Sequence, residues 1–246
     1  MREFEGKYAV VTGANRGIGR AVTEKLTENG ANIFAIVRNS DTLADIIVHA
    51  EKHGTEIIPV CCDLSDEASV TACAKKILSH KVPISLLINN AGVMYPESVL
   101  NMTPISRIKD VFQINLFSPL LLTQLISKNM IKHNSGNIIF VSSSAAFDAG
   151  SNVEYCSSKA AVLCAAKRLA TEYGSFNIRV NTVCPGPVDT DMGNMISEKT
   201  MDHVMAANIV KRKIEPDEVA ETILFLASER SGCITGQNFR IDSRIN

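Results

Sequence analysis

Short apolar runs rich in β-branched residues alternate with longer helix-like segments along the whole chain. This alternation is typical of stacked βαβ units around a parallel sheet. Strands are expected near residues 8–12, 32–37, 57–61, 86–89, 137–142, 179–184 and 238–241. Helices are expected near residues 17–29, 41–53, 66–80, 105–132, 153–173 and 216–228. The sequence therefore predicts a doubly wound, Rossmann-type α/β fold with a seven-stranded parallel sheet and helices on both faces.

The chain length and charge balance limit the partners that this protein can have. Its 246 residues suit one domain, residues 1–246, because no linker, repeat or low-complexity tract divides them. The 25 basic and 26 acidic residues nearly cancel, so no overall field attracts nucleic acid or an anionic membrane. No apolar run reaches the roughly eighteen residues of a membrane helix, and residues 1–7 do not resemble a signal peptide. We expect a cytoplasmic protein that acts on a small molecule.

Cysteine usage argues against a metal site. Seven cysteines occur, but none forms a C-x-x-C pair and no His-rich segment accompanies them. Cys61 and Cys62 are adjacent at the end of an expected strand, so their side chains point to opposite faces and cannot easily share a metal ion. We expect buried, reduced thiols and no bound metal.

The segment of residues 187–208 does not fit the alternation of strands and helices. It follows Pro185 and Gly186, begins with Pro187, and mixes polar residues with several methionines. Proline and glycine interrupt regular structure, and irregular segments beside strand ends often carry binding residues. We expect residues 187–208 to form a mobile lid over the substrate.

A glycine-rich segment follows the first expected strand and opens the first expected helix. Its sequence, TGANRGIG at residues 12–19, has the spacing G-x-x-x-G-x-G. Glycines let the backbone approach a pyrophosphate, and the N-terminus of the helix offers free N–H groups and a favourable dipole. An ordinary turn between strand and helix is the alternative. The residues expected to bind a dinucleotide here are Gly13, Asn15, Arg16, Gly17, Ile18 and Gly19.

Tyr155 and Lys159 lie four residues apart on an expected helix, so their side chains share one face. A tyrosine with a pKa of about 10 is a poor acid or base at neutral pH, but a nearby ammonium group and an oxidised nicotinamide both favour its phenolate. Tyr155 is then a candidate general acid or base. The alternative is a surface tyrosine and lysine with no shared task.

Several motifs together make the chain resemble a known family. They are the glycine-rich segment 12–19, Asn89-Asn90-Ala91-Gly92, Tyr155 with Lys159, and Pro185-Gly186. In this order and spacing they resemble the short-chain dehydrogenase/reductase family, along the chain from Gly6 to Asp242. The chain looks most like the branch of the 3-oxoacyl-[acyl-carrier-protein] reductases.

The end of the chain departs from that branch. Its members usually close their last strand with Val-Asp-Gly-Gly, whereas this chain reads Ile241-Asp242-Ser243-Arg244. The departure concerns C-terminal packing more than chemistry, because the tail commonly lies at a subunit interface in relatives. The resemblance implies a homotetramer in which the apolar helices of residues 101–132 and 153–173 pair between subunits.

The resemblance also implies a catalytic group of four residues, namely Asn115, Ser143, Tyr155 and Lys159. In relatives the asparagine perturbs a central helix and supports a water leading to the lysine. The serine polarises the substrate carbonyl, and the tyrosine delivers the proton. Aligning Gly136 and the strand after it with the family pattern G-x-I-x-x-[IV]-S-S selects Ser143, whereas counting thirteen residues back from Tyr155 selects Ser142.

A nicotinamide cofactor is implied as well, with contacts along the strand ends. Asp63 matches an acidic residue that commonly bonds the adenine amine, and Lys159 matches the residue that binds the ribose beside the nicotinamide. Val188 and Thr190 match positions that contact the nicotinamide carboxamide. The other residues expected to line the cofactor are Leu64, Asn90, Ala91, Gly92, Tyr155, Pro185 and Gly186.

The end of the second strand predicts which cofactor is preferred. NAD-specific relatives carry an acidic residue there, which bonds the ribose 2′-hydroxyl and repels a 2′-phosphate. This chain has Val37 at that position, followed by Arg38, and Arg16 projects from the glycine-rich segment. Two guanidinium groups could converge on a 2′-phosphate, so we expect NADP as the cofactor.

Together these features predict an NADP(H)-dependent oxidoreductase that transfers hydride between nicotinamide and a carbonyl or secondary alcohol. The most concrete hypothesis is a 3-oxoacyl thioester reductase, acting on a small substrate that is free or bound to a carrier. A sugar, polyol or other secondary-alcohol dehydrogenase is the second hypothesis. A catalytically retired NADP-binding protein is the third, and the presence of all four catalytic residues argues against it.

Overall fold

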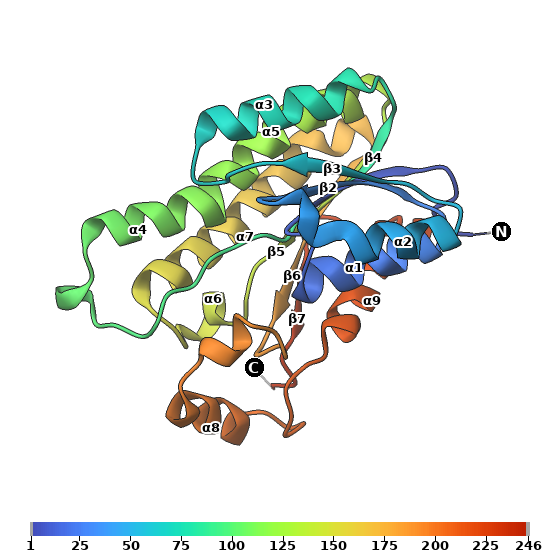
Figure 1. Ribbon diagram of the computed structural model, residues 1–246. Helices are drawn as coiled ribbons and strands as arrows, with labels where there is room; N and C mark the ends of the chain where they lie inside the picture. The colour runs from blue at the N-terminus through green and yellow to red at the C-terminus, as the bar shows by residue number, and fades with distance from the viewer. Residues whose placement is uncertain (1, 245–246) are drawn as a thin grey trace.

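The computed structural model describes residues 2–244 and contains one sheet of seven strands (Figure 1). The strands are β1 (Tyr8–Thr12), β2 (Asn32–Val37), β3 (Ile57–Cys61), β4 (Ile84–Asn89), β5 (Gly136–Val141), β6 (Ile178–Pro185) and β7 (Asn238–Ile241). Their order is β3-β2-β1-β4-β5-β6-β7, and every neighbouring pair is parallel. The predicted seven-stranded, doubly wound sheet is confirmed.

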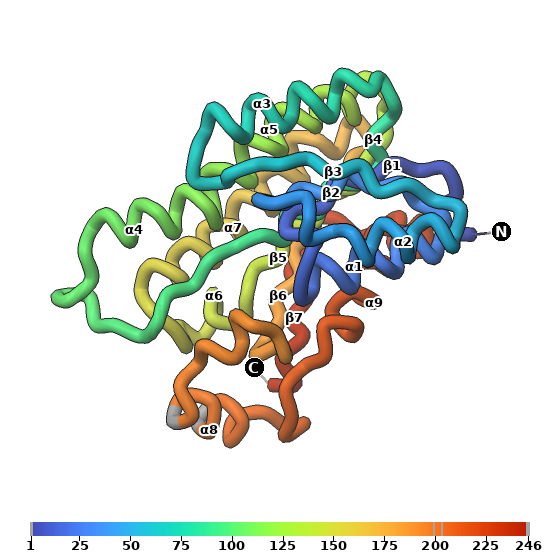
Figure 2. Tube along the Cα trace, viewed as in Figure 1, coloured from blue at the N-terminus to red at the C-terminus, as the bar shows by residue number. Residues whose placement is uncertain are grey.

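Helices cover both faces of this sheet (Figures 1 and 2). They are α1 (Gly17–Glu28), α2 (Ala44–Lys52), α3 (Glu67–Ser79), α4 (Ile105–Phe112), α5 (Ser118–Lys132), α6 (Ala145–Asp148), α7 (Val153–Tyr173), α8 (Glu198–Ala207) and α9 (Pro216–Ala227). Helices α1, α2 and α9 pack on one face, and α3, α5 and α7 pack on the other. None of the helices within residues 2–244 is long and apolar enough to cross a membrane.

Two apolar cores hold the helical layers to the sheet. Successive strand residues point to opposite faces, so Val11 packs with Leu26 of α1 and Ile223 of α9. Val10 packs on the other face, in a cluster that includes Ile126 of α5. All five side chains are fully buried. Because parallel strands are buried on both faces, they appear in the sequence as continuous apolar runs.

Residues 105–132 are helical throughout, as expected, but they are not α-helical along the whole length. A π-helical turn, Gln113–Phe117, separates α4 from α5. Pro119, in the first turn of α5, has no backbone N–H and would clash with the carbonyl of residue 115 in an unbroken helix. The predicted helix over residues 105–132 is therefore confirmed, and the proline could have signalled the π-helical turn within it.

The segment 187–208 contains a helix that the sequence did not predict. Helix α8 begins after Ser197, whose side chain accepts a hydrogen bond from the backbone N–H of Thr200. It lies apart from the sheet (Figure 2), and its described side chains form no buried apolar stripe like that of α1 or α9. Without that stripe, periodicity gives little signal. The mobility of this segment stays a prediction.

All seven cysteines are free, but they are not all buried. Cys61, Cys164 and Cys233 are exposed, so the expectation of buried thiols is wrong for these three. Cys61 ends β3, which is an edge strand with a neighbour on one side only. Its side chain therefore lacks the cover that a central strand would have.

The C-terminal departure from the related branch has a structural consequence. Ser243, where that branch has glycine, has a φ of 51°, which is in the left-handed region. The next residue, Arg244, forms an ion pair with Asp148 of α6, and its Nε donates to Asn208 Oδ1 at 3.0 Å. The last described residue thus connects the tail to α6 and to the end of α8.

Replacing Ser243 by glycine should stabilise the fold. A non-glycine residue in the left-handed conformation destabilises the folded state by about 1–2 kcal/mol. Glycine avoids this strain, but it loses more chain entropy on folding, which costs about 0.5–1 kcal/mol. Ser243→Gly should therefore raise the free energy of unfolding by up to about 1 kcal/mol and the Tm by about 2–4 °C. Thermal unfolding followed by circular dichroism measures this. Ser243→Ala is the control, because it keeps the strained backbone, and its Tm should not rise.

Candidate active site

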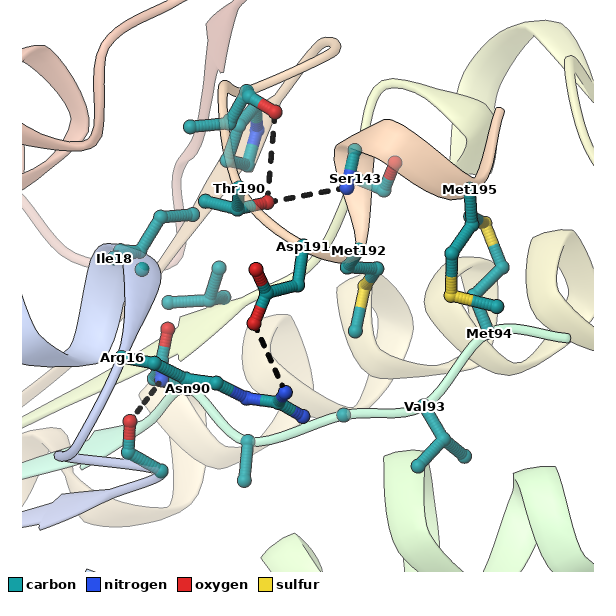
Figure 3. Close-up of a pocket in the computed structure, with 18 of the residues that line it drawn as sticks. Arg16, Ile18, Asn90, Val93, Met94, Ser143, Thr190, Asp191, Met192 and Met195 are labelled. Carbon is teal, nitrogen blue, oxygen red and sulfur yellow. Dashed lines mark hydrogen bonds and ion pairs between the residues drawn. The ribbon is translucent and has the colours of Figure 1, made fainter. Parts of the chain in front are cut away.

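A cavity of about 1050 Å³ opens at the carboxyl ends of the strands. This is where ligands bind in doubly wound sheets, beside the point at which the strand order reverses, here between β1 and β4. All the predicted site residues except Gly19 and Asn115 line the cavity. Figure 3 shows part of its wall, with Arg16, Asn90, Ser143 and Thr190 from different segments of the chain.

The glycine-rich segment has the geometry of an anion cradle. Gly13 and Gly17 have positive φ values of 66° and 52°, which favour glycine. A Cβ atom at Gly19 would lie 2.1 Å from the carbonyl oxygen of Gly13, so only glycine lets the loop close on the helix. No side chain caps the N-terminus of α1, and its first turn carries no acidic residue. The first N–H groups of this helix are thus suited to a phosphate.

Thr12 joins the chain segments that follow β1 and β4, the two strands between which the strand order reverses. Its hydroxyl oxygen accepts hydrogen bonds from the backbone N–H groups of Asn90 and Ala91, both at 2.9 Å. The Asn90 side chain donates in return to the carbonyl of Thr12, also at 2.9 Å. Asn90 and Ala91 therefore shape the cavity mainly by holding the loop after β4 against the end of β1.

Two arginines line the cavity, and each has an acidic neighbour of its own. The Arg16 guanidinium forms an ion pair with Asp191 at 3.1 Å (Figure 3). Arg38 is exposed, and its charge acts on Asp63. Hydrogen bonds from Ser65, together with the charge of Arg38, hold the pKa of Asp63 below its usual value.

Tyr155 is buried at the inner end of the cavity and is hydrogen-bonded to the Ser143 side chain. Burial raises the pKa of Tyr155 to about 12, although the hydrogen bond from Ser143 lowers it in part. With its pKa raised by burial, Tyr155 favours the neutral phenol, which can donate a proton. The expectation that Lys159 and an oxidised nicotinamide promote the phenolate stays a prediction.

The geometry separates the two candidate serines. Ser142 is buried, and its hydroxyl donates to the backbone carbonyl of Lys159 at 2.8 Å. Ser143 is half-buried, and its side chain meets the tyrosine hydroxyl. The proposal of Ser143 as the residue that polarises a carbonyl therefore fits the structure better than the proposal of Ser142.

Lys159 lies near the ring of Tyr155. Its Nζ is 5.8 Å from the centre of the Tyr155 ring and donates to the backbone carbonyl of Val141 at 2.9 Å. Burial lowers the pKa of Lys159 to about 8, so the ammonium form still predominates at neutral pH. A Cβ atom at Gly92 would lie 3.2 Å from Lys159 Nζ, and the glycine thus leaves the cavity side of the amine open.

Asn115 lies behind the cavity, in the π-helical turn. Its Oδ1 accepts from the backbone N–H of Val93 at 2.8 Å, and its Nδ2 donates to the Val93 carbonyl at 3.0 Å. Nδ2 also donates to Ser158 Oγ at 3.1 Å. With these bonds Asn115 positions the loop after β4 against α7, the helix that carries Tyr155 and Lys159.

Several lining residues were not predicted from the sequence. Met94, Asp148, Asp191 and Arg244 all border the cavity. Met94 and Asp191 lie two residues or fewer from predicted contacts, at Gly92 and Thr190, so strand-end position could have signalled them. Arg244 reaches the cavity only because the tail folds back toward α6, and no local pattern announces that contact.

A family model described as enoyl-(acyl carrier protein) reductase matches residues 13–243. The chain belongs to the short-chain dehydrogenase/reductase family. An L-xylulose reductase from Caenorhabditis elegans is 35% identical over 244 residues, which cover 98% of this chain and 96% of the relative. A 3-oxoacyl-[acyl-carrier-protein] reductase from Thermotoga maritima is 32% identical over 240 residues, with 97% of each chain covered.

A solved structure from Beutenbergia cavernae has the same fold, with a TM-score of 0.91 and 27% identity, covering 98% of this chain and 97% of the other. It is described provisionally as an NAD(P)-dependent gluconate 5-dehydrogenase with NADP bound at low occupancy. This short-chain dehydrogenase/reductase is thus an NAD(P)-dependent oxidoreductase that acts on CH–OH or C=O groups.

The residues of this dehydrogenase/reductase fit a bound dinucleotide. The glycine cradle and the uncapped end of α1 would hold the pyrophosphate, and Gly92 leaves Lys159 Nζ accessible to ribose hydroxyls. When bound, the nicotinamide supplies the hydride. The phenol of Tyr155 can give its proton to the substrate carbonyl oxygen that Ser143 polarises. The buried ammonium of Lys159 favours negative charge in this part of the site.

Removing the Tyr155 hydroxyl should abolish most of the reaction without emptying the pocket. Tyr155→Phe keeps the buried ring but removes the proton donor, so kcat should fall by about two to four orders of magnitude. Steady-state kinetics with NADPH measure the loss, and fluorescence titration should show cofactor binding largely retained. Tyr173→Phe is the matched control, since Tyr173 bonds Ser127 outside the cavity, and its kcat should stay near wild type. More than a tenth of the wild-type kcat in Tyr155→Phe would exclude Tyr155 as the acid.

Proposed function

We propose that this protein is an NADP(H)-dependent carbonyl reductase with 3-oxoacyl thioesters as its best-supported substrates. One observation supports carbonyl reduction in particular. The buried phenol of Tyr155, whose pKa is raised to about 12, is hydrogen-bonded to Ser143 at the cavity wall. A protonated donor beside a polarising hydroxyl suits proton delivery to a carbonyl oxygen. The same pKa makes Tyr155 a poor base for the reverse reaction until a cofactor charge is added.

The apolar lining of the cavity favours a substrate with an acyl chain. Met94, Met192 and Met195 all line the cavity, and Figure 3 labels the three side chains. Methionine is apolar and flexible, and it can adapt to an alkyl chain but offers sugar hydroxyls almost no hydrogen bonds. The similarity to a 3-oxoacyl-[acyl-carrier-protein] reductase agrees with this proposal.

A sugar or polyol dehydrogenase is the second candidate. The observation that favours it is the 35% identity to an L-xylulose reductase along nearly the whole chain. A retired NADP-binding protein is the third. Against it stands the shared position of Ser143, Tyr155 and Lys159 at the cavity wall, which a chain without catalysis has no need to keep.

A panel of NADPH-oxidation assays distinguishes the candidates. It contains an acetoacetyl thioester, ketoses, diketones and cyclic ketones at matched concentrations. We expect the thioester to give the highest kcat/KM. A higher kcat/KM for a ketose would favour the polyol hypothesis, and a protein that binds NADPH but turns over none of these substrates would favour the retired protein.

The cofactor preference rests on the end of β2. Val37 is buried and uncharged, so no carboxylate there would repel a 2′-phosphate. Arg38 follows and lines the cavity with an exposed guanidinium. Arg16 also lines the cavity but is paired with Asp191, so Arg38 is the guanidinium more readily available to a phosphate.

Reversing the charge of Arg38 should reverse much of the preference for NADP(H). We expect the wild-type kcat/KM to be about two orders of magnitude higher with NADPH than with NADH, from charge-assisted contacts to the phosphate. In Arg38→Asp the ratio of kcat/KM with NADPH to kcat/KM with NADH should fall to near one. Arg168→Asp, on an exposed turn of α7 outside the cavity, is the control that should keep it. A wild-type preference for NADH would refute the proposal, and unchanged selectivity in Arg38→Asp would transfer the role to Arg16.

We also propose a cytoplasmic homotetramer. Ile105 of α4 is 66% exposed and Val153 of α7 is 44% exposed, on helices that the family resemblance pairs between subunits. Phe117, in the turn before α5, is 52% exposed. Large apolar side chains gathered on neighbouring helices favour burial against another copy.

Light scattering at micromolar concentration tests the tetramer. The expected mass is about four times that of the 26.7 kDa chain. Phe117→Lys places a charge at the proposed contact and should lower the mass, whereas Phe176→Lys, on another exposed phenylalanine, should leave it unchanged. A wild-type mass of one chain contradicts the proposal.

A further inference from the structure

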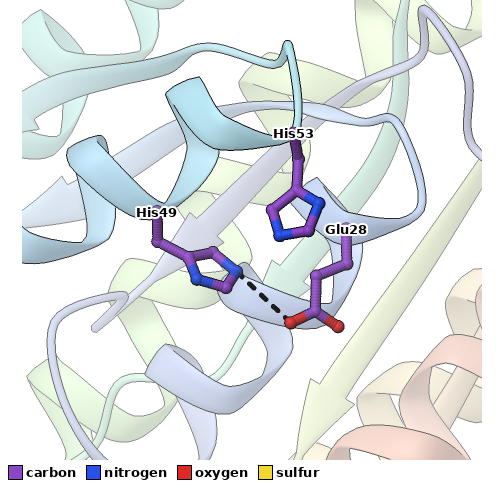
Figure 4. A group of neighbouring side chains, drawn as sticks. All are labelled: Glu28, His49 and His53. Atoms are coloured by element: carbon purple, nitrogen blue, oxygen red, sulfur yellow. Dashed lines mark ion pairs between the residues drawn. The ribbon is translucent and has the colours of Figure 1, made fainter.

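We propose that Glu28, His49 and His53 bind one divalent transition-metal cation, for which Zn²⁺ is the appropriate probe. The three residues lie where α1 and α2 end (Figure 4). Glu28 is the last residue of α1, His49 is in the last turn of α2, and His53 follows that helix directly. The expectation of no bound metal considered the cysteines and did not consider this group.

The spacing of the two histidines suits a shared metal ion. His49 and His53 are four residues apart, so their imidazoles lie on the same side of the helix end, as in helical zinc sites with paired histidines. Their ring centres are 4.8 Å apart. Imidazole nitrogen and carboxylate oxygen are both ordinary ligands of zinc.

One interatomic distance matches the edge of a tetrahedral site. One ligand atom from each of the three residues lies within 4.8 Å of the other two. His49 Nε2 and Glu28 Oε1 are 3.3 Å apart. Two ligands at about 2.0–2.1 Å from a tetrahedral zinc are separated by about 3.3–3.4 Å, so this pair already spans one edge of the tetrahedron. Small side-chain rotations of His53 would complete a three-residue face with a fourth position open to water.

The Nε2 atom of His49 lacks a hydrogen-bond partner among the described residues, and a metal ion could take that place. This atom is shielded from solvent and makes no well-directed hydrogen bond, although Glu28 is near it. A buried polar atom without a partner costs free energy. A cation placed between Nε2 and the carboxylate would supply the partner for both.

The local electrostatics favour a cation at this point. The C-terminal ends of α1 and α2 converge here, and each helix end carries partial negative charge. Lys25 is bonded to Glu221 at 2.7 Å, although its charge also acts on Glu28, and Arg2 donates to the backbone carbonyl of His53. Glu28 supplies a carboxylate that would compensate part of the charge of the metal.

This site is remote from the reaction. Helix α1 has 12 residues and begins in the glycine-rich cradle, so Glu28 is about 18 Å from the phosphate site along the helix. A metal bound to Glu28 and the histidines would join the ends of α1 and α2. Its effect is expected on stability and not on turnover.

Titration calorimetry of the full-length protein with ZnCl₂, after removal of metals by a chelator, tests the proposal. We expect one site whose affinity falls as the pH is lowered, because protonated imidazole cannot bind a metal. At saturating Zn²⁺ the Tm should rise by about 5 °C. The double variant His49→Gln/His53→Ala should lose this site and this rise, whereas His133→Ala, at the matching end of α5, should keep both.

The exposed cysteines require a second measurement, since Cys61, Cys164 and Cys233 could also bind zinc. Imidazole resonances in NMR spectra need no variant. Those of His49 and His53 should shift on addition of one equivalent of Zn²⁺, whereas those of His80 and His133 should not. Unmoved resonances of His49 and His53, or zinc binding that persists undiminished in the double variant, would overturn the proposal.

Discussion

The hydroxyl of Thr12 holds together the two loops on which the site depends. It accepts from the backbone of Asn90 and Ala91, and so it fixes the end of β1 against the loop after β4. From that loop Val93 bonds Asn115, and Asn115 bonds Ser158 of the helix that carries Tyr155 and Lys159. One chain of hydrogen bonds therefore runs from the phosphate cradle to the catalytic helix. The relative position of cofactor and proton donor depends on it.

Patterns repeated over many residues made the fold predictable. The strands appeared as apolar runs because both faces of the sheet are buried, as the opposite packing of Val10 and Val11 shows. The elements that were missed lack such repetition: the described side chains of α8 form no buried stripe, and the π-helical turn follows from one proline, Pro119. Sequence spacing placed most of the site residues at one cavity, since parallel strands end at the same edge of a sheet.

The contacts of the charged side chains could not be predicted from the sequence. The amine of Lys159 donates to the carbonyl of Val141, and burial moves the pKa values of Tyr155 and Lys159 in opposite directions. The pairing of Arg16 with Asp191 and the approach of Glu28 to His49 join residues far apart in the chain. Such contacts follow from how helices and loops pack, and no local periodicity encodes them.

The ion pair between Arg16 and Asp191 competes with any anion that binds Arg16. Arg16 belongs to the phosphate cradle and Asp191 to residues 187–208, and both line the cavity. An anion that attracts the guanidinium weakens its bond to the carboxylate, and by thermodynamic linkage the ion pair lowers the affinity for that anion by the same factor. Both groups are exposed, so salt weakens this coupling, and ionic strength controls how strongly the ion pair opposes the anion.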